Sequence, residues 1–334
     1  MTQNPQNIEI INTTPDSIPG LQRFSHEAMA TTFEIIIQYE DKHYARQAAF
    51  AAFEELDRLE QQLSRFIENS DISQINKLAS GIPLMIDLDT FECLQLCSQM
   101  YVETSGAFDI TIGSLYDCWL DDGNKLHEPT ESDLDSARQC AGLELLKLDE
   151  AEHSVQLVKS GVQIDLGGFG KGYALDRLAE LLRQWSIDKA LLKAASSSVL
   201  AIEGPAGMNG WPVTLSNPSN CNQLFARLDF KNRALGGSGL QKGRHIIDPR
   251  TACPVGDKTA AWACAVSAAT ADALSTAFMV MSIDEIEQYC RQHQDVLAAI
   301  VTSQDIAKAA KNRFLYFGPW KPSHLERRGS SGFD

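Results

Sequence analysis

The chain has 334 residues, of which 44% are hydrophobic and 22% are charged, and these values are typical of a folded protein with a substantial core. Its formal net charge of −15 excludes nucleic-acid binding through clustered Lys and Arg and disfavours adhesion to anionic lipid. An anionic ligand is compatible with this charge only where a metal, a lysine or backbone N–H groups reverse the local field.

Both ends of the chain are polar. We expect residues 1–23 to form a flexible leader, residues 24–320 to form the folded unit and residues 321–334 to form a polar tail. The sequence shows no secretory signal, no lipobox-like cysteine and no apolar run of the ~18 residues that a membrane span needs. Its eight cysteines have no paired spacing, which favours reduced thiols. These features predict a cytoplasmic protein without a membrane segment.

The predicted elements alternate between strands and helices. Residues 33–37 have the two-residue period of a strand, and residues 49–63 have the three- and four-residue spacing of an amphipathic helix. A second helix is expected from Asp89 and Thr90 to Gly106, and a β-hairpin at 155–164. A helix at 174–185 follows. Further strands are predicted at 189–194, 198–203, 211–215, 224–230, 262–268 and 297–302, and further helices at 270–281 and 283–292. This order favours an α+β fold of mixed sheets with packed helices and closely associated subdomains.

A glycine-rich segment, Asp165-Leu-Gly-Gly-Phe-Gly-Lys-Gly172, lies between a predicted strand and a predicted helix. Its glycines permit close approach of the backbone to a ligand, and the following helix N-terminus offers N–H groups to phosphate. Lys171 adds a positive charge. The spacing matches neither the dinucleotide-binding fingerprint nor a Walker A loop. A tight turn without a ligand is an equally good interpretation of this segment alone.

A second motif, Ala271-Asp-Ala-Leu-Ser-Thr276, lies near the start of a predicted helix. Asp272 and Thr276 are four residues apart, so that the carboxylate and the hydroxyl project from one helical face. Such an oxygen pair suits Mg²⁺, which completes its octahedron with water and phosphate oxygens. Helix capping by the same two side chains is the simpler alternative.

Two further segments carry polar residues at turns. His245-Ile-Ile-Asp-Pro-Arg-Thr251 follows a Gly-Gly-Ser-Gly run at 236–239 and contains a His–Asp pair that suits proton transfer. An Asp-Pro turn with a structural histidine is the alternative. Ser105-Gly-Ala-Phe-Asp109 marks the end of a helix and gives no functional indication by itself.

Taken in order, these segments resemble the ApbE family of FAD:protein FMN transferases. The similarity runs from about Ala28 to Thr276, which is most of the folded unit. It is carried by Ala28-Met-Ala-Thr31, Leu63-Ser-Arg-Phe66, Ser70-Asp-Ile-Ser-Gln-Ile-Asn76, Ser105–Thr111, Asp165–Ala174, His245–Thr251 and Ala271–Thr276. The resemblance implies an ApbE-like fold, FAD as substrate, Mg²⁺ as cofactor and an acceptor flavoprotein as partner.

The resemblance also implies roles for particular residues. The residues expected to border or contact FAD are Met29, Phe66, Ala107, Phe108, Asp109, Asp165, Lys171 and Ile247. The residues expected to hold Mg²⁺ are Asp272, Thr276 and the main chain at Gly168. His245 is our candidate for the base that removes the proton of the attacking hydroxyl.

The implied reaction is phosphoryl transfer, in which a Ser or Thr hydroxyl of the acceptor protein attacks the FMN-side phosphorus of FAD and AMP departs. Two alternatives use the same site: an FAD pyrophosphatase that yields FMN and AMP, and a catalytically silent FAD-binding protein.

The sequence departs from the family pattern in two places. Ala194-Ala-Ser-Ser-Ser198 stands where the family usually has Gly-Gly-Asp or Gly-Gly-Asn, and Ala252-Cys253 follows Thr251 where a glycine is common. Because side chains with a Cβ restrict the backbone, we expect a reshaped wall at the first departure.

Overall fold

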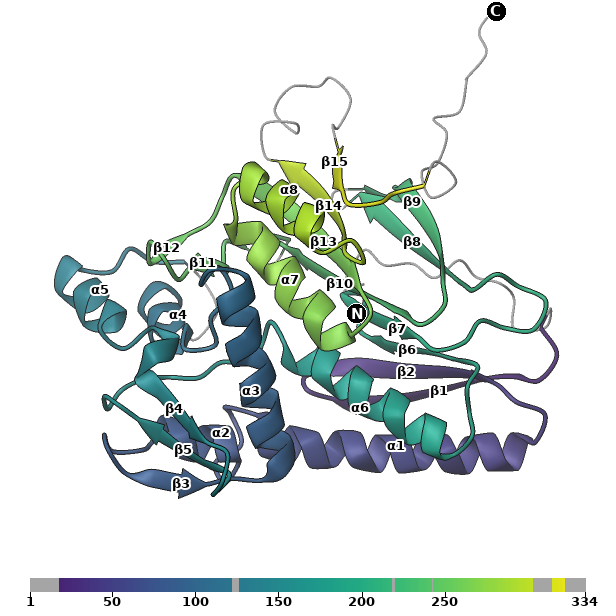
Figure 1. Ribbon diagram of the computed structural model, residues 1–334, viewed down its shortest axis with the longest axis horizontal. Coiled ribbons are helices and arrows are strands. Elements are labelled where there is room, and N and C mark those ends of the chain that lie inside the picture. Colours follow the sequence, from purple (N-terminus) through teal and green to yellow (C-terminus); the bar gives the residue numbers. More distant parts are fainter. Residues whose placement is uncertain (1–17, 122–125, 218–219, 242, 303–313, 322–334) are drawn as a thin grey trace, which may run out of the picture.

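The structure is a computed structural model that describes residues 18–121, 126–217, 220–241, 243–302 and 314–321. Its largest element is an eight-stranded antiparallel sheet with the order β1-β2-β6-β7-β10-β13-β14-β15 (Figure 1). These strands are β1 Leu21–Ala28, β2 Thr31–Gln38, β6 Ala190–Ala194, β7 Ser198–Ala201, β10 Arg233–Gly239, β13 Lys258–Ala265, β14 Leu297–Thr302 and β15 Phe314–Phe317. Within the described residues, no helix is both long enough and apolar enough to span a bilayer.

In the described part of the chain, three smaller sheets accompany the large one. A three-stranded sheet has the order β3-β5-β4, and two hairpins are formed by β8 with β9 and by β11 with β12. The strands are β3 Pro83–Met85, β4 Leu146–Asp149, β5 Ser154–Leu157, β8 Trp211–Asn217, β9 Asn220–Phe230, β11 Ile247–Asp248 and β12 Cys253–Pro254. The helices are α1 Lys42–Leu63, α2 Asp71–Asn76, α3 Leu88–Glu103, α4 Gly113–Trp119, α5 Glu131–Arg138, α6 Gly170–Gln184, α7 Ala268–Val280 and α8 Ile283–Gln292.

The two faces of the large sheet belong to two hydrophobic clusters. In β2, Phe33, Ile35 and Ile37 point into the main core with α1, α6 and α7, whereas Ile36 points to the opposite face. Residues of the β8–β9 hairpin cover that second face. The strand period of two places alternate side chains in different layers, so that a hydrophobic residue is required on both faces.

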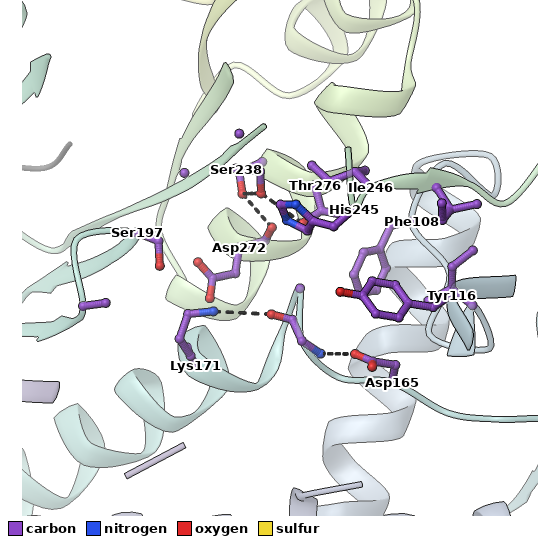
Figure 2. A pocket seen from close by; sticks show the side chains of 18 of the residues that line it. Phe108, Tyr116, Asp165, Lys171, Ser197, Ser238, His245, Ile246, Asp272 and Thr276 are labelled. Atoms are coloured by element: carbon purple, nitrogen blue, oxygen red, sulfur yellow. Dashed lines mark hydrogen bonds between the residues drawn. The ribbon is translucent and has the colours of Figure 1, made fainter. Parts of the chain in front are cut away.

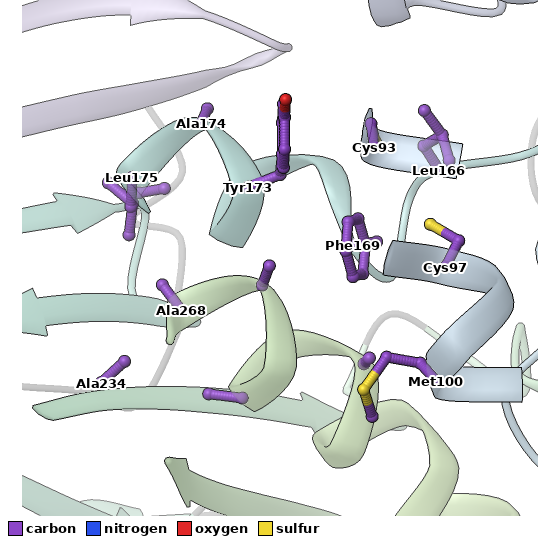
Figure 3. Packing of buried hydrophobic residues seen from close by; sticks show 14 of the residues in the cluster. Cys93, Cys97, Met100, Leu166, Phe169, Tyr173, Ala174, Leu175, Ala234 and Ala268 are labelled. Atoms are coloured by element: carbon purple, nitrogen blue, oxygen red, sulfur yellow. The ribbon is translucent and has the colours of Figure 1, made fainter. Parts of the chain in front are cut away.

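Helix α7 lies in the centre of the protein and is buried on nearly all sides. It contacts β10, β13 and α6, and the approach is close because glycines stand at the crossings. A Cβ atom at Gly172 of α6 would lie 2.2 Å from the Ala268 carbonyl oxygen, and one at Gly236 of β10 would lie 2.3 Å from the Ala271 carbonyl oxygen. Figure 3 shows the α6 segment from Phe169 to Leu175 between α7 at Ala268 and the α3 residues Cys93 and Cys97.

The predicted α+β class of mixed sheets with packed helices is confirmed, as are the strand at 33–37 and the helices α1, α6, α7 and α8. The hairpin at 155–164 is wrong, because β5 pairs with β3 and β4 while Gln163 forms only an isolated bridge to Ile112. The leader was predicted to extend to residue 23, but β1 begins at Leu21 and pairs with β2. Residues 1–17 and 322–334 of the predicted tails lie outside the described residues.

Candidate functional site

The predicted site residues surround a single cavity of about 840 Å³ (Figure 2). The cavity lies where the β1–β2 turn, the loop before α6, one face of α7, the end of β10 and the β11 segment meet. It is lined by all of the residues singled out above, namely Met29, Phe66, Ala107, Phe108, Asp109, Asp165, Gly168, Lys171, His245, Ile247, Asp272 and Thr276. Segments that are far apart in the sequence therefore form one wall, although their chemical roles stay predictions.

The glycine-rich segment forms a turn that delivers the N-terminus of α6 to the cavity. The Asp165 carboxylate accepts a hydrogen bond from the Gly167 N–H at 2.7 Å and so shapes the turn. Helix α6 begins at Gly170, and its N-cap residue Phe169 makes no side-chain capping hydrogen bond. Lys171 reaches back, and its Nζ donates to the Gly167 carbonyl at 3.3 Å (Figure 2). The positive end of the helix dipole and a lysine therefore act on the same part of the cavity.

Asp272 of α7 is a buried carboxylate beside the first turn of α6. Its Oδ1 accepts from the Ser198 hydroxyl at 2.7 Å, and its Oδ2 accepts from the Gly172 N–H of α6 at 2.8 Å. Burial raises the pKa of Asp272 from 3.8 to about 6, while Lys171 and the two hydrogen bonds act in the opposite direction. A carboxylate desolvated in this way is stabilised by any cation that enters the cavity beside it.

The capping alternative for the α7 motif is partly wrong. Helix α7 is capped one turn earlier by Ser267, whose hydroxyl accepts from the Thr270 N–H. Asp272 instead accepts an N–H from the first turn of a different helix, α6. Thr276 lies one turn after Asp272 on the same face and lines the cavity.

Gly168 leaves room beside the Thr276 hydroxyl. A Cβ atom at Gly168 would lie 2.9 Å from Thr276 Oγ1, so only glycine keeps this space open. The described residues contain no cluster of three His, Cys, Asp or Glu side chains that would hold a metal by themselves. The set formed by Asp272, Thr276 and the Gly168 main chain has hard oxygen donors and a single carboxylate, and it fits an ion that keeps water or phosphate ligands, as Mg²⁺ does.

The other wall of the cavity combines apolar and polar groups. Phe108 is buried against Phe169, with ring centroids 5.9 Å apart, whereas the Phe66 side chain is 87% exposed. Asp109 is buried, and its Oδ1 accepts from both the N–H and the hydroxyl of Thr111 at 2.7 Å. Burial raises the pKa of Asp109, and the bonds to Thr111 oppose this effect.

The β1–β2 hairpin ends at the cavity. Met29 and Ala30 form its turn with φ values of 50° and 55°, and the Met29 N–H donates to Glu60 Oε1 of α1 at 2.8 Å. Two residues with positive φ are what a tight hairpin turn requires. The turn thus fixes the Met29 backbone on the cavity wall.

Arg250 anchors the His245–Thr251 segment through hydrogen bonds to the α7–α8 corner. Arg250 donates to Glu285 Oε1 at 2.7 Å and to the Val280 carbonyl at 3.4 Å, at the corner between α7 and α8. His245 Nδ1 lies 2.9 Å from the Gly243 carbonyl, which can only accept. Nδ1 of the neutral ring therefore carries the proton, and Nε2 is the basic nitrogen.

Arg65 also lines the cavity, although no role is expected for it from the sequence. Its Nη1 donates to Asp165 Oδ2 at 2.9 Å, and its Nη2 donates to Asp117 Oδ1 of α4 at 2.7 Å. Its guanidinium also lies 5.5 Å from the centre of the Phe66 ring. Arg65 thus joins the glycine-rich turn to α4. The residue lies inside the Leu63-Ser-Arg-Phe66 segment, but its two partners are distant in the sequence.

The two departures from the family pattern fall on backbone positions that favour glycine. Ala195, in the β6–β7 turn, has φ of 51°, and Ala252, after the His245–Thr251 segment, has φ of 59°. The β6–β7 turn is nevertheless well connected, because the Ala195 N–H donates to the Thr32 carbonyl at 2.9 Å. Ser198 from the same segment holds Asp272. The departure therefore places hydroxyls on this wall while it keeps a left-handed turn.

The fold and the cavity together define an α+β protein whose site suits a phosphorylated ligand. Residues 29–301 match the family model described as the ApbE family. The chain is 26% identical over 298 residues to the FAD:protein FMN transferase of Salmonella typhimurium, covering 84% of both proteins. It is 26% identical over 257 residues to the enzyme of the same name from Escherichia coli K12, covering 71% of this chain and 72% of that protein.

Solved structures agree with this assignment. The ApbE protein of Thermotoga maritima matches with a TM-score of 0.78 and 25% identity, covering 89% of this chain and 97% of that one. The flavin transferase ApbE of Vibrio cholerae shares the fold, with a TM-score of 0.75 at 20% identity and coverage of 89% and 97%. The chain belongs to the ApbE family and is a transferase enzyme.

Proposed function

We propose that this enzyme transfers the FMN moiety of FAD to a Ser or Thr hydroxyl of an acceptor protein in a Mg²⁺-dependent reaction that releases AMP. The observation that carries the proposal is the convergence of the α6 N-terminus and Lys171 with the Asp272–Thr276 face of α7 in one cavity. The names of the similar enzymes from Salmonella typhimurium and Escherichia coli support FAD as the substrate and a protein as the acceptor.

The cavity contains the groups that a pyrophosphate needs on an acidic protein. The α6 N-terminus directs its positive dipole end towards the glycine-rich turn, and Lys171 adds a full charge there. Backbone N–H groups and a point charge hold phosphate oxygens without a large basic surface. This local arrangement is compatible with the net charge of −15, because it needs positive groups only where the phosphates bind.

Asp272, Thr276 and the Gly168 main chain are the groups that would hold Mg²⁺. When bound, this ion supplies Lewis acidity to the pyrophosphate and neutralises negative charge on the departing AMP. Asp272 contributes the single carboxylate. Burial removes water from this charge, so that a cation beside it stabilises the charged form. Gly168 keeps the space beside Thr276 Oγ1 open.

In the proposed reaction, the acceptor hydroxyl oxygen bonds to the FMN-side phosphorus. The bond from that phosphorus to the bridging oxygen breaks, and AMP leaves with this oxygen and its electron pair. The acceptor hydroxyl loses its proton in the same step. His245 Nε2 is the candidate base, because Nδ1 is committed to the Gly243 carbonyl.

The test is incubation of the full chain with FAD and Mg²⁺, with and without a candidate acceptor protein. AMP is measured by chromatography, and covalent flavin is measured by in-gel fluorescence. We expect AMP only together with a fluorescent acceptor, and we expect Asp272→Ala to abolish both signals. AMP formed without an acceptor would establish an FAD pyrophosphatase instead. If FAD binds but no AMP is released, even with an acceptor protein that an active relative flavinylates, the protein is a catalytically silent FAD binder.

His245→Gln separates the base from the binding groups. The variant should bind FAD as the wild type does and should lose roughly 10²-fold or more in transfer rate, which is the usual contribution of a general base. Gln139→Ala on the distant C-cap of α5 serves as the control. Wild-type turnover in His245→Gln would remove His245 from the mechanism and leave the rest of the proposal intact.

A further inference from the structure

Three hydroxyl groups form a chain beside the candidate metal ligands. Ser238 of β10 has its Oγ 3.1 Å from Thr276 Oγ1 (Figure 2). The same oxygen lies 2.8 Å from Ser275 Oγ. Ser275 Oγ in turn lies 2.9 Å from the main-chain carbonyl oxygen of Asp272. Ser275 is 1% exposed, so its hydroxyl has protein groups as partners rather than bulk water.

The direction of this chain follows from counting protons. Each hydroxyl has one proton to donate, and a carbonyl oxygen can only accept. Ser275 must therefore give its proton to the Asp272 carbonyl. Ser238 must then donate to Ser275, and it is left to accept from Thr276. Only this assignment makes all three contacts hydrogen bonds.

The consequence concerns the face of Thr276 that lines the cavity. With its proton committed to Ser238, Thr276 Oγ1 presents lone pairs and no hydrogen to the space beside Gly168. A cation needs this orientation from a neutral hydroxyl ligand. A hydroxyl free to rotate would point its proton towards the incoming ion for part of the time and would weaken binding.

We propose that Ser238 and Ser275 are positioning residues that fix the Thr276 hydroxyl as a lone-pair donor for the divalent cation. The inference rests on the metal site of the proposed function and adds two residues that do not themselves bind the ion. Ser275 is buried, and its hydroxyl is linked to that of Thr276 through Ser238. Its effect on the cation therefore depends on the direction in which each hydroxyl of the chain donates its proton. Deleting its hydroxyl lets Ser238 donate to Thr276, which turns the Thr276 proton into the cavity.

The experiment measures Mn²⁺ binding as a probe for Mg²⁺, so that the result does not depend on turnover. Free Mn²⁺ is titrated by electron paramagnetic resonance with the FAD-saturated full chain in the absence of acceptor. We expect Ser275→Ala and Ser238→Ala each to raise the Kd for Mn²⁺ by about tenfold, the usual effect of losing a group that orients a metal ligand. Thr276→Val should weaken binding at least as much, and Ser238→Thr, which keeps the hydroxyl, should remain near the wild type.

The matched control is Thr90→Val. It removes a buried hydroxyl that donates to Asp71 Oδ2 at 2.7 Å, far along the chain from the site, and it should leave the Kd for Mn²⁺ unchanged. Urea unfolding of each variant shows whether the fold is retained. The inference would be overturned if folded Ser275→Ala and Ser238→Ala bind Mn²⁺ with wild-type affinity. In that case weaker binding by Asp272→Asn would show that the metal site itself is still correct. No Mn²⁺ binding by the wild type would overturn the inference together with the metal dependence of the proposed function.

Discussion

Replacing Asp272 by asparagine should stabilise the metal-free protein. Burial raises the pKa of Asp272 from 3.8 to about 6, a change of about two units, and each unit corresponds to about 1.4 kcal/mol. The pKa of Asp272 is higher in the folded state than in the unfolded state, so protonation of this carboxyl favours folding. The stabilisation by the protonated carboxyl is fully present below about pH 4. It is lost as the pH rises through about 6. The charged carboxylate therefore costs about 3 kcal/mol at pH 8.

Asparagine can replace the carboxylate without leaving a buried group unpaired. Its amide oxygen can accept from the Gly172 N–H, and its amide N–H can donate to Ser198 Oγ, since a hydroxyl accepts as readily as it donates. We expect Asp272→Asn to raise the free energy of unfolding by about 3 kcal/mol at pH 8 and by about half of that at pH 5. The same variant should lose transferase activity, because the carboxylate is the only charged member of the candidate metal set.

The assay is urea unfolding of both proteins with a chelator at pH 5 and pH 8. Asp135→Asn on the surface of α5 serves as the control, because this aspartate is exposed and its carboxylate pairs with Arg138 of the same helix. Its effect should be small and similar at the two pH values. A folded Asp272→Asn protein that is no more stable than the wild type at pH 8 would refute the reasoning, since burial would then carry no cost for the charge.

Three further changes test other parts of the structure. Lys171→Met should raise the Kd for FAD by about tenfold or more in a fluorescence titration, because a charge-assisted contact to phosphate is lost; an unchanged Kd would place the phosphates elsewhere. Gly172→Ala should lower the free energy of unfolding by about 2 kcal/mol or more in urea, since its Cβ would lie 2.2 Å from the Ala268 carbonyl oxygen; wild-type stability would show that α6 and α7 can separate. Ala252→Gly should raise the free energy of unfolding by about 1 kcal/mol, because φ of 59° favours glycine. A lower free energy of unfolding would show that the alanine methyl group contributes more stability than the backbone strain costs.

Elements with a strong hydrophobic period could be predicted from the sequence. The spacing of alanine and leucine in α1 places its buried residues on the core side, and the alternation in β2 separates Phe33 from Ile36. In both elements the local period agrees with the layer that the element covers. Helix α8 shows the same agreement, and a capping box at Ser282 and Glu285 marks its start. Helix α7 differs, because it is buried on nearly all sides and its apolar residues are not confined to one face.

Other elements were missed because their pairing is decided by distant segments. Three of the seven residues of β10 are glycines, which locally indicate a loop, yet β10 pairs with both β7 and β13. Glycine is needed at Gly236 because α7 crosses the strand there. The segment at 155–164 has good local hairpin signals, but β5 finds two better partners in β3 and β4. Local β-propensity gives no information about which distant strands compete to pair with a segment.

The same limit applies to the site. The motif residues were identified in the sequence because their types and spacing suggest chemistry. Arg65, Ser198 and Ser238 were not, because a serine or arginine acquires a role only from its partners. Ser198 and Ser238 come from different strands, and each contacts a different residue of the α7 motif. No spacing rule within either segment indicates that contact.

The geometry of the site depends on two helices that cap one another. Asp272 of α7 accepts the Gly172 N–H in the first turn of α6, while Asp176 of α6 accepts the Ala268 and Ala269 N–H groups in the first turn of α7. Two helix N-termini that meet would repel each other, and a carboxylate from each partner offsets the positive dipole ends. One of these carboxylates is the candidate metal ligand, and the helix that it caps carries Lys171. A shift of either helix therefore changes the phosphate-binding end and the metal-binding face together, so the spacing between the two is fixed by the same hydrogen bonds that stabilise the core.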